Sequence, residues 1–181
     1  MKSVIIVYDS LMHLTDLLNN VINGILSINQ SNTLSINVRS IDINNYNITD
    51  LISADTIIFG CHTIMGGVSS EFKLFMEYLD GSWQNQVLKD KFAAGFTTGH
   101  SRFDKTGTLQ ELSMFSAMHS MVWISQGHIA ENSEYNTLKI NRLNMYLGLA
   151  SEPNIDRDDR EADNRTAYLF GRRIAKITCG V

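Results

Sequence analysis

Short apolar runs rich in β-branched residues alternate along this chain with segments of helical periodicity, and this alternation constrains the fold more than any other feature. Residues 3–8 form an uninterrupted run typical of a central parallel strand that is covered on both faces. Four further runs have strand character: 35–40, 54–61, 91–98 and 121–125. Five strands that alternate with helices predict an α/β fold, a parallel sheet with right-handed crossovers and helices on both faces.

Helices are expected where apolar residues recur three and four positions apart. This spacing covers residues 14–26 and then 72–79, where Ser69 or Ser70 could cap the helix. It returns at 109–118 and at 167–177. The segment 126–155 is the least regular, and it is long enough to be a functional excursion.

Length and charge limit the classes of protein to consider. A chain of 181 residues is expected to form one domain, residues 1–181, with a single core. Its net charge of −4 argues against a nucleic acid or an anionic membrane as partner, because both need clustered Lys and Arg. The apolar run at the amino terminus is too short for a secretory signal, and two cysteines without a CxxC spacing predict free thiols. We therefore expect a cytoplasmic protein.

Three loops rich in hydroxyl groups and glycine follow the predicted strands. They cover residues 9–15, 60–70 and 97–108. In a sheet of this kind ligands bind outside the carboxyl ends of the strands, where the winding reverses direction. A helix amino terminus with free N–H groups and hydroxyls can hold a phosphate there, although Asp9, Ser10 and Thr15 could equally be helix caps. The three loops together predict a ligand site at this edge.

At this point the residues resemble a known family. The resemblance is densest in Ala-Asp-Thr-Ile-Ile-Phe-Gly at 54–60, the turn at 63–67, Gly-Ser-Trp at 81–83, residues 96–99 and Met-His-Ser-Met-Val at 118–122. These segments resemble WrbA-type NAD(P)H:quinone oxidoreductases and the neighbouring NADPH-dependent FMN reductases of the flavodoxin superfamily. The resemblance implies a flavodoxin-like, doubly wound, five-stranded parallel sheet of order 2-1-3-4-5 with FMN at its carboxyl edge. It also implies NAD(P)H as co-substrate and a quinone-like or flavin molecule as the small-molecule electron acceptor.

The resemblance also implies roles for individual residues. Around the FMN phosphate it places Ser10, Met12, His13, Leu14 and Thr15. Against the isoalloxazine ring it places His62, Thr63, Ile64, Met65, Gly66 and Gly67, and along the other edge Thr97, Thr98, Gly99 and His100. It implies that His119 lies near the polar edge of the flavin as a catalytic residue, and that Trp83 walls the cavity for nicotinamide or quinone. A homodimer or homotetramer, with the active site completed by a neighbour, is implied as well.

Some residues depart from the family pattern and keep alternatives open. Met12 stands where the family usually has glycine, in a loop that is one residue shorter, so a protein that has lost FMN is one alternative. His62 replaces a common proline, and residues 100–104 replace a glycine-rich stretch. A flavodoxin-type electron carrier and a receiver-type regulatory domain are further alternatives. The low net charge argues against the first, and a lone Asp9 without a second acid argues against the second.

Several of these residues also have purely structural interpretations. His119 could be hydrogen-bonded to a carbonyl, Trp83 could seal the end of a helix, and Cys61 could be a small core residue. No ligand spacing of His and Cys is present, so a metal site is not expected.

Overall fold

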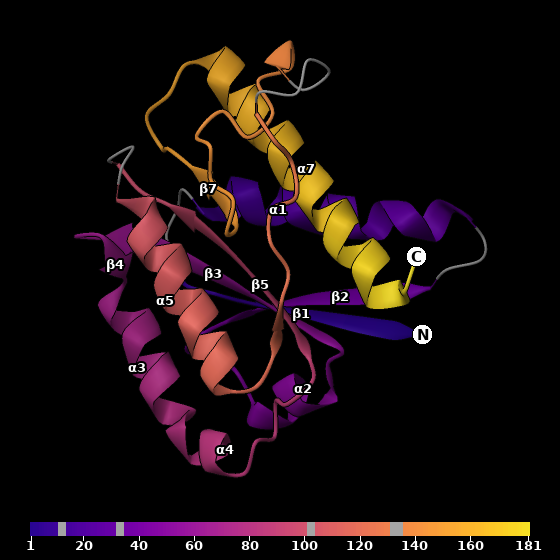
Figure 1. The fold of residues 1–181 in the computed structure, drawn as a ribbon, viewed down its shortest axis with the longest axis vertical. Helices are drawn as coiled ribbons and strands as arrows, with labels where there is room; N and C mark the ends of the chain where they lie inside the picture. Colours follow the sequence, from indigo (N-terminus) through magenta and orange to yellow (C-terminus); the bar gives the residue numbers. More distant parts are fainter. Residues whose placement is uncertain (11–13, 32–34, 101–103, 131–135) are drawn as a thin grey trace.

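The computed structural model describes residues 1–10, 14–31, 35–100, 104–130 and 136–181 (Figure 1). Its strands are β1 (Lys2–Tyr8), β2 (Ile36–Asp42), β3 (Thr56–Ile64), β4 (Gly67–Val68), β5 (Phe92–Thr98), β6 (Val122–Trp123) and β7 (Leu149–Ser151). Its helices are α1 (Leu14–Leu26), the 3-10 turn η1 (Ser27–Ser31), α2 (Ile48–Ser53), α3 (Ser70–Tyr78), α4 (Asp80–Gln84), α5 (Lys105–Met118) and α7 (Arg157–Cys179). Among the described residues, none of these helices is both long and apolar enough to cross a membrane.

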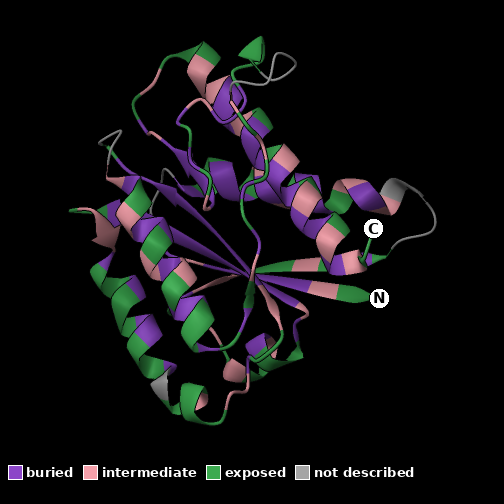
Figure 2. Cartoon of the chain, viewed as in Figure 1, coloured by how far each residue is buried: buried purple, intermediate pink, exposed green. Residues whose placement is uncertain are grey.

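The strands form one parallel sheet in the order β2-β1-β3-β5-β6. This order confirms the doubly wound arrangement 2-1-3-4-5, with the winding reversed between β1 and β3. Strand β4 folds back antiparallel on the end of β3, so Ile64 pairs with Gly67. The central strand β3 is buried along almost its whole length, as a continuous apolar run predicts (Figure 2).

The fifth strand differs from the single run predicted at 121–125. It consists of two pieces: β6 pairs with the first residues of β5, and β7 pairs with the last three. Residues 124–148 leave the sheet between them. Gly148 permits the return, because a Cβ atom there would lie 2.3 Å from the Gly95 carbonyl oxygen. The Trp123 indole N–H donates to the Leu147 carbonyl at 2.8 Å and joins the two ends of the excursion.

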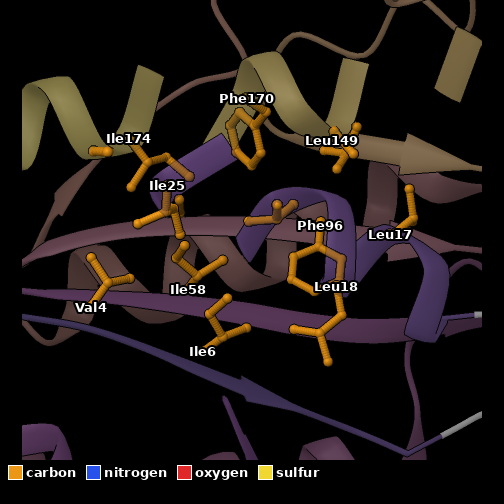
Figure 3. Close-up of a cluster of buried hydrophobic side chains, with 14 of the residues drawn as sticks. Val4, Ile6, Leu17, Leu18, Ile25, Ile58, Phe96, Leu149, Phe170 and Ile174 are labelled. Atoms are coloured by element: carbon orange, nitrogen blue, oxygen red, sulfur yellow. The ribbon is translucent and has the colours of Figure 1, made fainter. Parts of the chain in front are cut away.

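Helices cover both faces of the sheet, as predicted. Helices α1 and α7 pack on one face over Ile6, Ile58 and Phe96 (Figure 3). Helices α2, α3 and α5 cover the other face, over Ile57 and Phe59. Strand residues alternate between the two clusters, because successive side chains point to opposite faces.

Helix boundaries follow the capping chemistry of the sequence. The Ser69 side chain accepts a hydrogen bond from the Phe72 N–H at 3.2 Å, which confirms Ser69 as the cap of α3. Helix α7 begins ten residues before the predicted 167–177, with Asp156 as its cap. Its first turns are charged and carry little apolar periodicity, which is why the sequence pattern missed them.

Helices α1 and α7 lie side by side in Figure 1 and approach closely at two glycines. A Cβ atom on Gly24 would lie 2.0 Å from the Tyr168 carbonyl oxygen, and one on Gly171 would lie 2.1 Å from the Val21 carbonyl oxygen. Both oxygens belong to backbone, so neither can move away without moving a helix. The spacing of this helix pair therefore depends on the two glycines.

Replacing Gly171 with Ala should destabilise the protein, because the added methyl group overlaps the backbone of α1. We expect the free energy of unfolding to fall by about 1–3 kcal/mol in urea denaturation. Gly81→Ala is the matched control: Gly81 is exposed in α4, with no atom within 4 Å of the added Cβ. It should be neutral or stabilising by up to about 1 kcal/mol. Equal effects of the two substitutions would contradict this account of the helix pair.

Candidate functional site

The strands that precede the three predicted polar loops end side by side at the carboxyl edge of the sheet. The chain leaves β1 at Asp9, β3 at Ile64 and β5 at Gly99, and these three strands are neighbours. The winding reverses between the first two of them. This is the position at which sheets of this kind bind their ligands.

Three buried threonines join the ends of β3 and β5 to the first turn of α5. The Thr63 hydroxyl lies 2.7 Å from that of Thr97 and 2.8 Å from that of Thr108. The Thr108 hydroxyl donates to the Gly67 carbonyl at 2.9 Å. Thr108 is the last residue of the predicted polar loop 97–108, but it was not among the residues assigned to the flavin. Its hydroxyl fixes α5 against the hairpin that follows β3.

The hairpin between β3 and β4 turns at Met65 and Gly66. Both have positive φ angles, 50° and 83°, as a two-residue type I′ turn requires. Met65 is 99% exposed, and Ile64 beside it is 49% exposed. Gly107 lets α5 approach this turn, since a Cβ atom there would lie 2.0 Å from the Gly66 carbonyl oxygen. The Ile64 and Met65 side chains are therefore exposed, on a turn whose backbone packs closely against α5.

Glu111 of α5 braces the same hairpin from the side. It accepts a hydrogen bond from the Val68 N–H at 3.1 Å and pairs with Lys73 of α3 at 2.6 Å. Partial burial raises the pKa of the Glu111 carboxyl, but the hydrogen bonds from Lys73 and Val68 outweigh it, and the pKa is lowered. Glu111 therefore stays charged and joins β4, α3 and α5.

The last two side chains of β5, Thr97 and Thr98, point to opposite faces of the sheet. Thr97 belongs to the hydroxyl cluster, whereas Thr98 donates to the Ser151 carbonyl of β7 at 3.3 Å. Gly99 donates to the same carbonyl, and a Cβ atom on Gly99 would lie 2.9 Å from the Thr63 Cβ. Glycine at this position lets the end of β5 lie directly against β3.

The loop after β1 is the predicted phosphate site. Met12 and His13 lie outside the described residues. Ser10 and Thr15 are exposed at this edge, whereas the Leu14 side chain is buried in the core, so only its backbone can face a ligand. Burial raises the pKa of the Asp42 carboxyl at the end of β2, but hydrogen bonds from Ser10 and Asn44 outweigh it, and the pKa is lowered.

His62 and His100 lie close to each other at the edge. Their ring centroids are 6.4 Å apart. His62 is buried at the end of β3, and its backbone N–H donates to Asp9 at 2.9 Å, whereas His100 is exposed. The structure thus brings His62, Thr63, Thr97, Thr98, Gly99 and His100 together with the hairpin residues Ile64, Met65, Gly66 and Gly67.

His119 and Trp83 lie together, but not with these residues. His119 ends α5, whose first turn carries Thr108. A helix of 14 residues is about 21 Å long at a rise of ~1.5 Å per residue, so His119 lies at the opposite end of α5 from the carboxyl edge. Its ring packs on Phe115 at a centroid distance of 4.6 Å. Within one chain, the predicted catalytic residue therefore does not face the predicted flavin loops.

His119 and Trp83 line an apolar groove between α3, α4 and α5. Its volume is about 450 Å³, and its walls include Met76, Met114 and Met118. Met114 is 64% exposed and Met118 54% exposed. Exposed apolar side chains gathered in one groove indicate a surface that contacts another molecule.

A buried group of charges anchors the excursion 124–148 beside the site. Arg142 binds Asp163 of α7 through two hydrogen bonds, at 2.8 and 3.0 Å, and binds Glu152 at 3.0 Å. Glu152 also lies 3.9 Å from Lys105, the fully buried first residue of α5. Burial lowers the pKa of Lys105 even though Glu152 and Asp104 lie near it. The first turn of α5 is thus connected to the excursion through Glu152.

Comparison with known proteins agrees with this geometry. The family model described as NADPH-dependent FMN reductase matches residues 36–135. The flavodoxin FldP of Pseudomonas aeruginosa is 30% identical over 132 residues, covering 70% of this chain and 72% of FldP. The quinone oxidoreductase QR2 of Triphysaria versicolor is 29% identical over 136 residues, covering 71% of this chain and 64% of QR2. The crystal structure of a WrbA-like flavodoxin from Agrobacterium tumefaciens has a TM-score of 0.72 at 27% identity, with 98% of each chain covered.

Because that model matches more than half of the chain, the protein belongs to the NADPH-dependent FMN reductase family, a family of flavin-dependent oxidoreductases. The resemblance drawn from the sequence and the flavodoxin-like fold are both confirmed. The turn at Met65 and Gly66 fits the flat ring of FMN, because a Cβ atom on Gly66 would meet open space and the backbone there is accessible to a ligand.

The left-handed backbone conformation of Met65 should lower the free energy of unfolding by a measurable amount. We expect Met65→Gly to raise the free energy of unfolding by about 0.5–1 kcal/mol, because glycine adopts a positive φ without steric strain. Met65→Ala is the control, since it removes the same exposed side chain and keeps the strain. Urea denaturation of the flavin-free protein measures both. A gain for Ala equal to that for Gly would show that the backbone of this turn is unstrained.

Proposed function

We propose that this protein is an FMN-dependent oxidoreductase that passes electrons from NAD(P)H through FMN to a quinone-like or flavin acceptor. The observation that carries the proposal is the convergence of the Thr63–Thr97–Thr108 cluster and the Met65–Gly66 turn at the carboxyl edge of a sheet from this family. The quinone oxidoreductase QR2 supports the acceptor class. We place the protein in the cytoplasm, because Cys61 and Cys179 are both free thiols.

The residues of the edge would hold FMN in three parts. Ser10, Thr15 and the first N–H groups of α1 would face the phosphate. The hairpin at Ile64–Gly67 would lie against one side of the ring, and residues 97–100 would line its edge. When bound, FMN would supply the redox chemistry: it can accept a hydride and pass the electrons to a second molecule.

The chain itself supplies position and exclusion of water. The threonine cluster and the Glu111 brace fix the hairpin, so that the exposed Ile64 and Met65 side chains stay where they would cover the ring. Hydride transfer depends on the distance and alignment of the reacting atoms, so a hairpin held from two sides favours it.

His119 and Trp83 would act on the ligand site of a second copy. The length of α5 separates them from the edge of their own chain, and the groove that they line is open and apolar. A homodimer or homotetramer that seats this groove over a partner's edge would bring both residues to the acceptor. Trp83 would then wall the acceptor cavity, and His119 would donate a hydrogen bond at the polar edge of the ring.

The visible absorption spectrum of the purified protein tests the enzymatic proposal. Flavin absorption should appear after FMN is added, bleach under anaerobic conditions with NADPH or NADH, and return when a benzoquinone is supplied. A flavin that neither nicotinamide reduces would contradict the oxidoreductase. Absence of binding would instead support the alternative in which the altered phosphate loop has lost the cofactor.

A one-electron carrier is the second candidate, because the relative FldP is named a flavodoxin. A carrier would bind FMN and accept electrons from a reductase protein or from dithionite, but not directly from NADPH. The anaerobic bleaching experiment therefore separates the two functions in one titration.

Replacing His119 with Ala should lower turnover far more than it changes FMN affinity. We expect a loss of about tenfold or more in kcat with the quinone, since one charge-assisted or buried hydrogen bond is worth roughly 1.5–3 kcal/mol. Gln110→Ala is the matched control, because Gln110 is exposed on α5 and does not line the groove.

The oligomeric state is measured on the same samples by size-exclusion chromatography with light scattering. We expect a dimer or tetramer for all three proteins. A fully active monomer, or a His119→Ala variant with unchanged steady-state rate, would contradict the role of the groove.

A further inference from the structure

The first two turns of α5 lie between the hairpin that follows β3 and the excursion that interrupts the fifth strand. On the hairpin side, the Thr108 hydroxyl donates to the Gly67 carbonyl at 2.9 Å. Gly107 lets the backbone of α5 approach the Gly66 carbonyl, because a Cβ atom there would lie 2.0 Å from that oxygen. Both contacts end on backbone atoms of the hairpin, so no side-chain rotation can relieve them. A shift of this part of α5 would therefore also move the hairpin.

The opposite face of the same two turns contacts the excursion. The Leu109 side chain packs in a buried cluster with Leu143 and Met145, and the Thr106 hydroxyl donates to the Met145 sulfur at 3.6 Å. A Cβ atom on Gly148 would lie 2.8 Å from the Leu109 side chain. By helical periodicity these residues lie on the face of α5 that points away from the hairpin. The excursion therefore supports α5 from behind the hairpin contacts.

Glu152 adds a charged contact to this support, because its carboxylate is shared by two largely buried cations. It accepts a hydrogen bond from Arg142 at 3.0 Å and lies 3.9 Å from the Nζ atom of Lys105, the fully buried first residue of α5. Asp104 approaches the same Nζ atom at 3.8 Å, whereas the charge of Arg142 opposes that of Lys105. Without the Glu152 carboxylate, two cations would repel each other in a region that little water reaches.

The backbone at Glu152 is fixed to the end of β5. Glu152 directly follows β7, whose Ser151 carbonyl accepts hydrogen bonds from the Gly99 N–H and the Thr98 hydroxyl, both at 3.3 Å. Glu152 therefore acts on Lys105 from a backbone that belongs to the sheet. When its charge is removed, we expect α5 to move rather than β7.

We propose that Glu152 is a positioning residue for the flavin site, acting through Lys105 and α5 on the Met65–Gly66 turn. Its carboxylate holds the first turn of α5 in place, and α5 holds the turn that would lie against the flavin ring. This inference rests on the proposed function. Because the route passes through the hairpin, it affects contacts with the ring and not with the phosphate. Glu152 should therefore influence the binding of FMN and of riboflavin, which has no phosphate, to the same extent.

The test is a titration of the flavin-free protein with FMN and with riboflavin, followed by quenching of flavin fluorescence. In Glu152→Gln the Kd should rise about fivefold to tenfold for FMN, and by the same factor for riboflavin. The visible circular dichroism of the bound flavin should also change, because it reports the contacts of the ring. A variant that is only less stable would keep the wild-type Kd and spectrum as long as it stays folded, which urea denaturation checks.

Asp159→Asn is the matched control, because Asp159 is a carboxylate of the same group of charges. It lies 3.5 Å from Arg142 and 2.7 Å from Lys139. Its removal weakens the anchoring of the excursion but leaves the Glu152 carboxylate beside Lys105. Both flavin Kd values should therefore change less than about twofold.

A second background tests the route through Lys105. Lys105→Met replaces the ammonium group with an apolar side chain of similar length, which suits a fully buried position. In this background Glu152→Gln should change the flavin Kd less than about twofold, because no uncompensated cation remains on α5. A rise as large as in the wild-type background would contradict the route. If Glu152→Gln does not fold, Glu152→Asp takes its place: it draws the carboxylate back by one methylene, and both Kd values should rise about twofold to threefold.

The possible failures are distinguishable. If the wild type binds flavin and Glu152→Gln binds both flavins with wild-type affinity, this inference is wrong and the flavin site stands. A loss of affinity for FMN but not for riboflavin would also overturn it, because it would assign Glu152 to the phosphate. If the wild type binds neither flavin, the proposed function fails together with this inference.

Discussion

The burial of β3 between β1 and β5, at every residue before Ile64, is the constraint on which the rest of the structure depends. Each neighbour pairs with β3 in parallel register, so the level at which all three strands end is set by one set of backbone hydrogen bonds. The hairpin that continues from β3 inherits this fixed position. The hydroxyl cluster around Thr63 also fixes the first turn of α5 relative to the end of β3. The positions of the three loops that form the site therefore all depend on β3.

The sequence predicted what local patterns encode. Five strand regions in a parallel sheet follow from periodicity, and three polar loops follow from hydroxyl and glycine content, whereas the strand order was implied by the family resemblance. The structure confirms the parallel sheet and its order. Two boundaries were wrong for physical reasons. The sequence missed the second part of the fifth strand, Leu149–Ser151, because three residues are too few to show a period. Helix α7 starts early because its first turns are stabilised by Asp156 and by charged side chains, which carry no apolar signal.

The part of the candidate site at the carboxyl edge could be predicted from the sequence, whereas contacts between residues far apart in the chain could not. Thr63, Thr97 and Gly99 lie in the hydroxyl- and glycine-rich segments at the ends of predicted strands, and the resemblance assigned them to the flavin site. Thr108 was not assigned to it, since its partners come from two strands that only the fold brings together. His119 was selected by resemblance alone, although its place between the predicted helix 109–118 and the predicted strand 121–125 already puts it at the amino edge of a parallel sheet, opposite the carboxyl edge. The sequence indicated which residues to consider, but the distances between them could be obtained only from the tertiary structure.

The divided fifth strand separates the sheet from the segment inserted into it. Trp123 pairs with Ala93 and Leu149 pairs with Phe96, so two residues of β5 lie between the paired stretches. Ile124 and Gly148, the first and last residues of the excursion 124–148, are the two residues that would continue the register opposite them. The register therefore resumes after the insertion as if the strand had never been interrupted. A change in the length of the segment between Ile124 and Gly148 would therefore leave the pairing of both stretches with β5 unchanged.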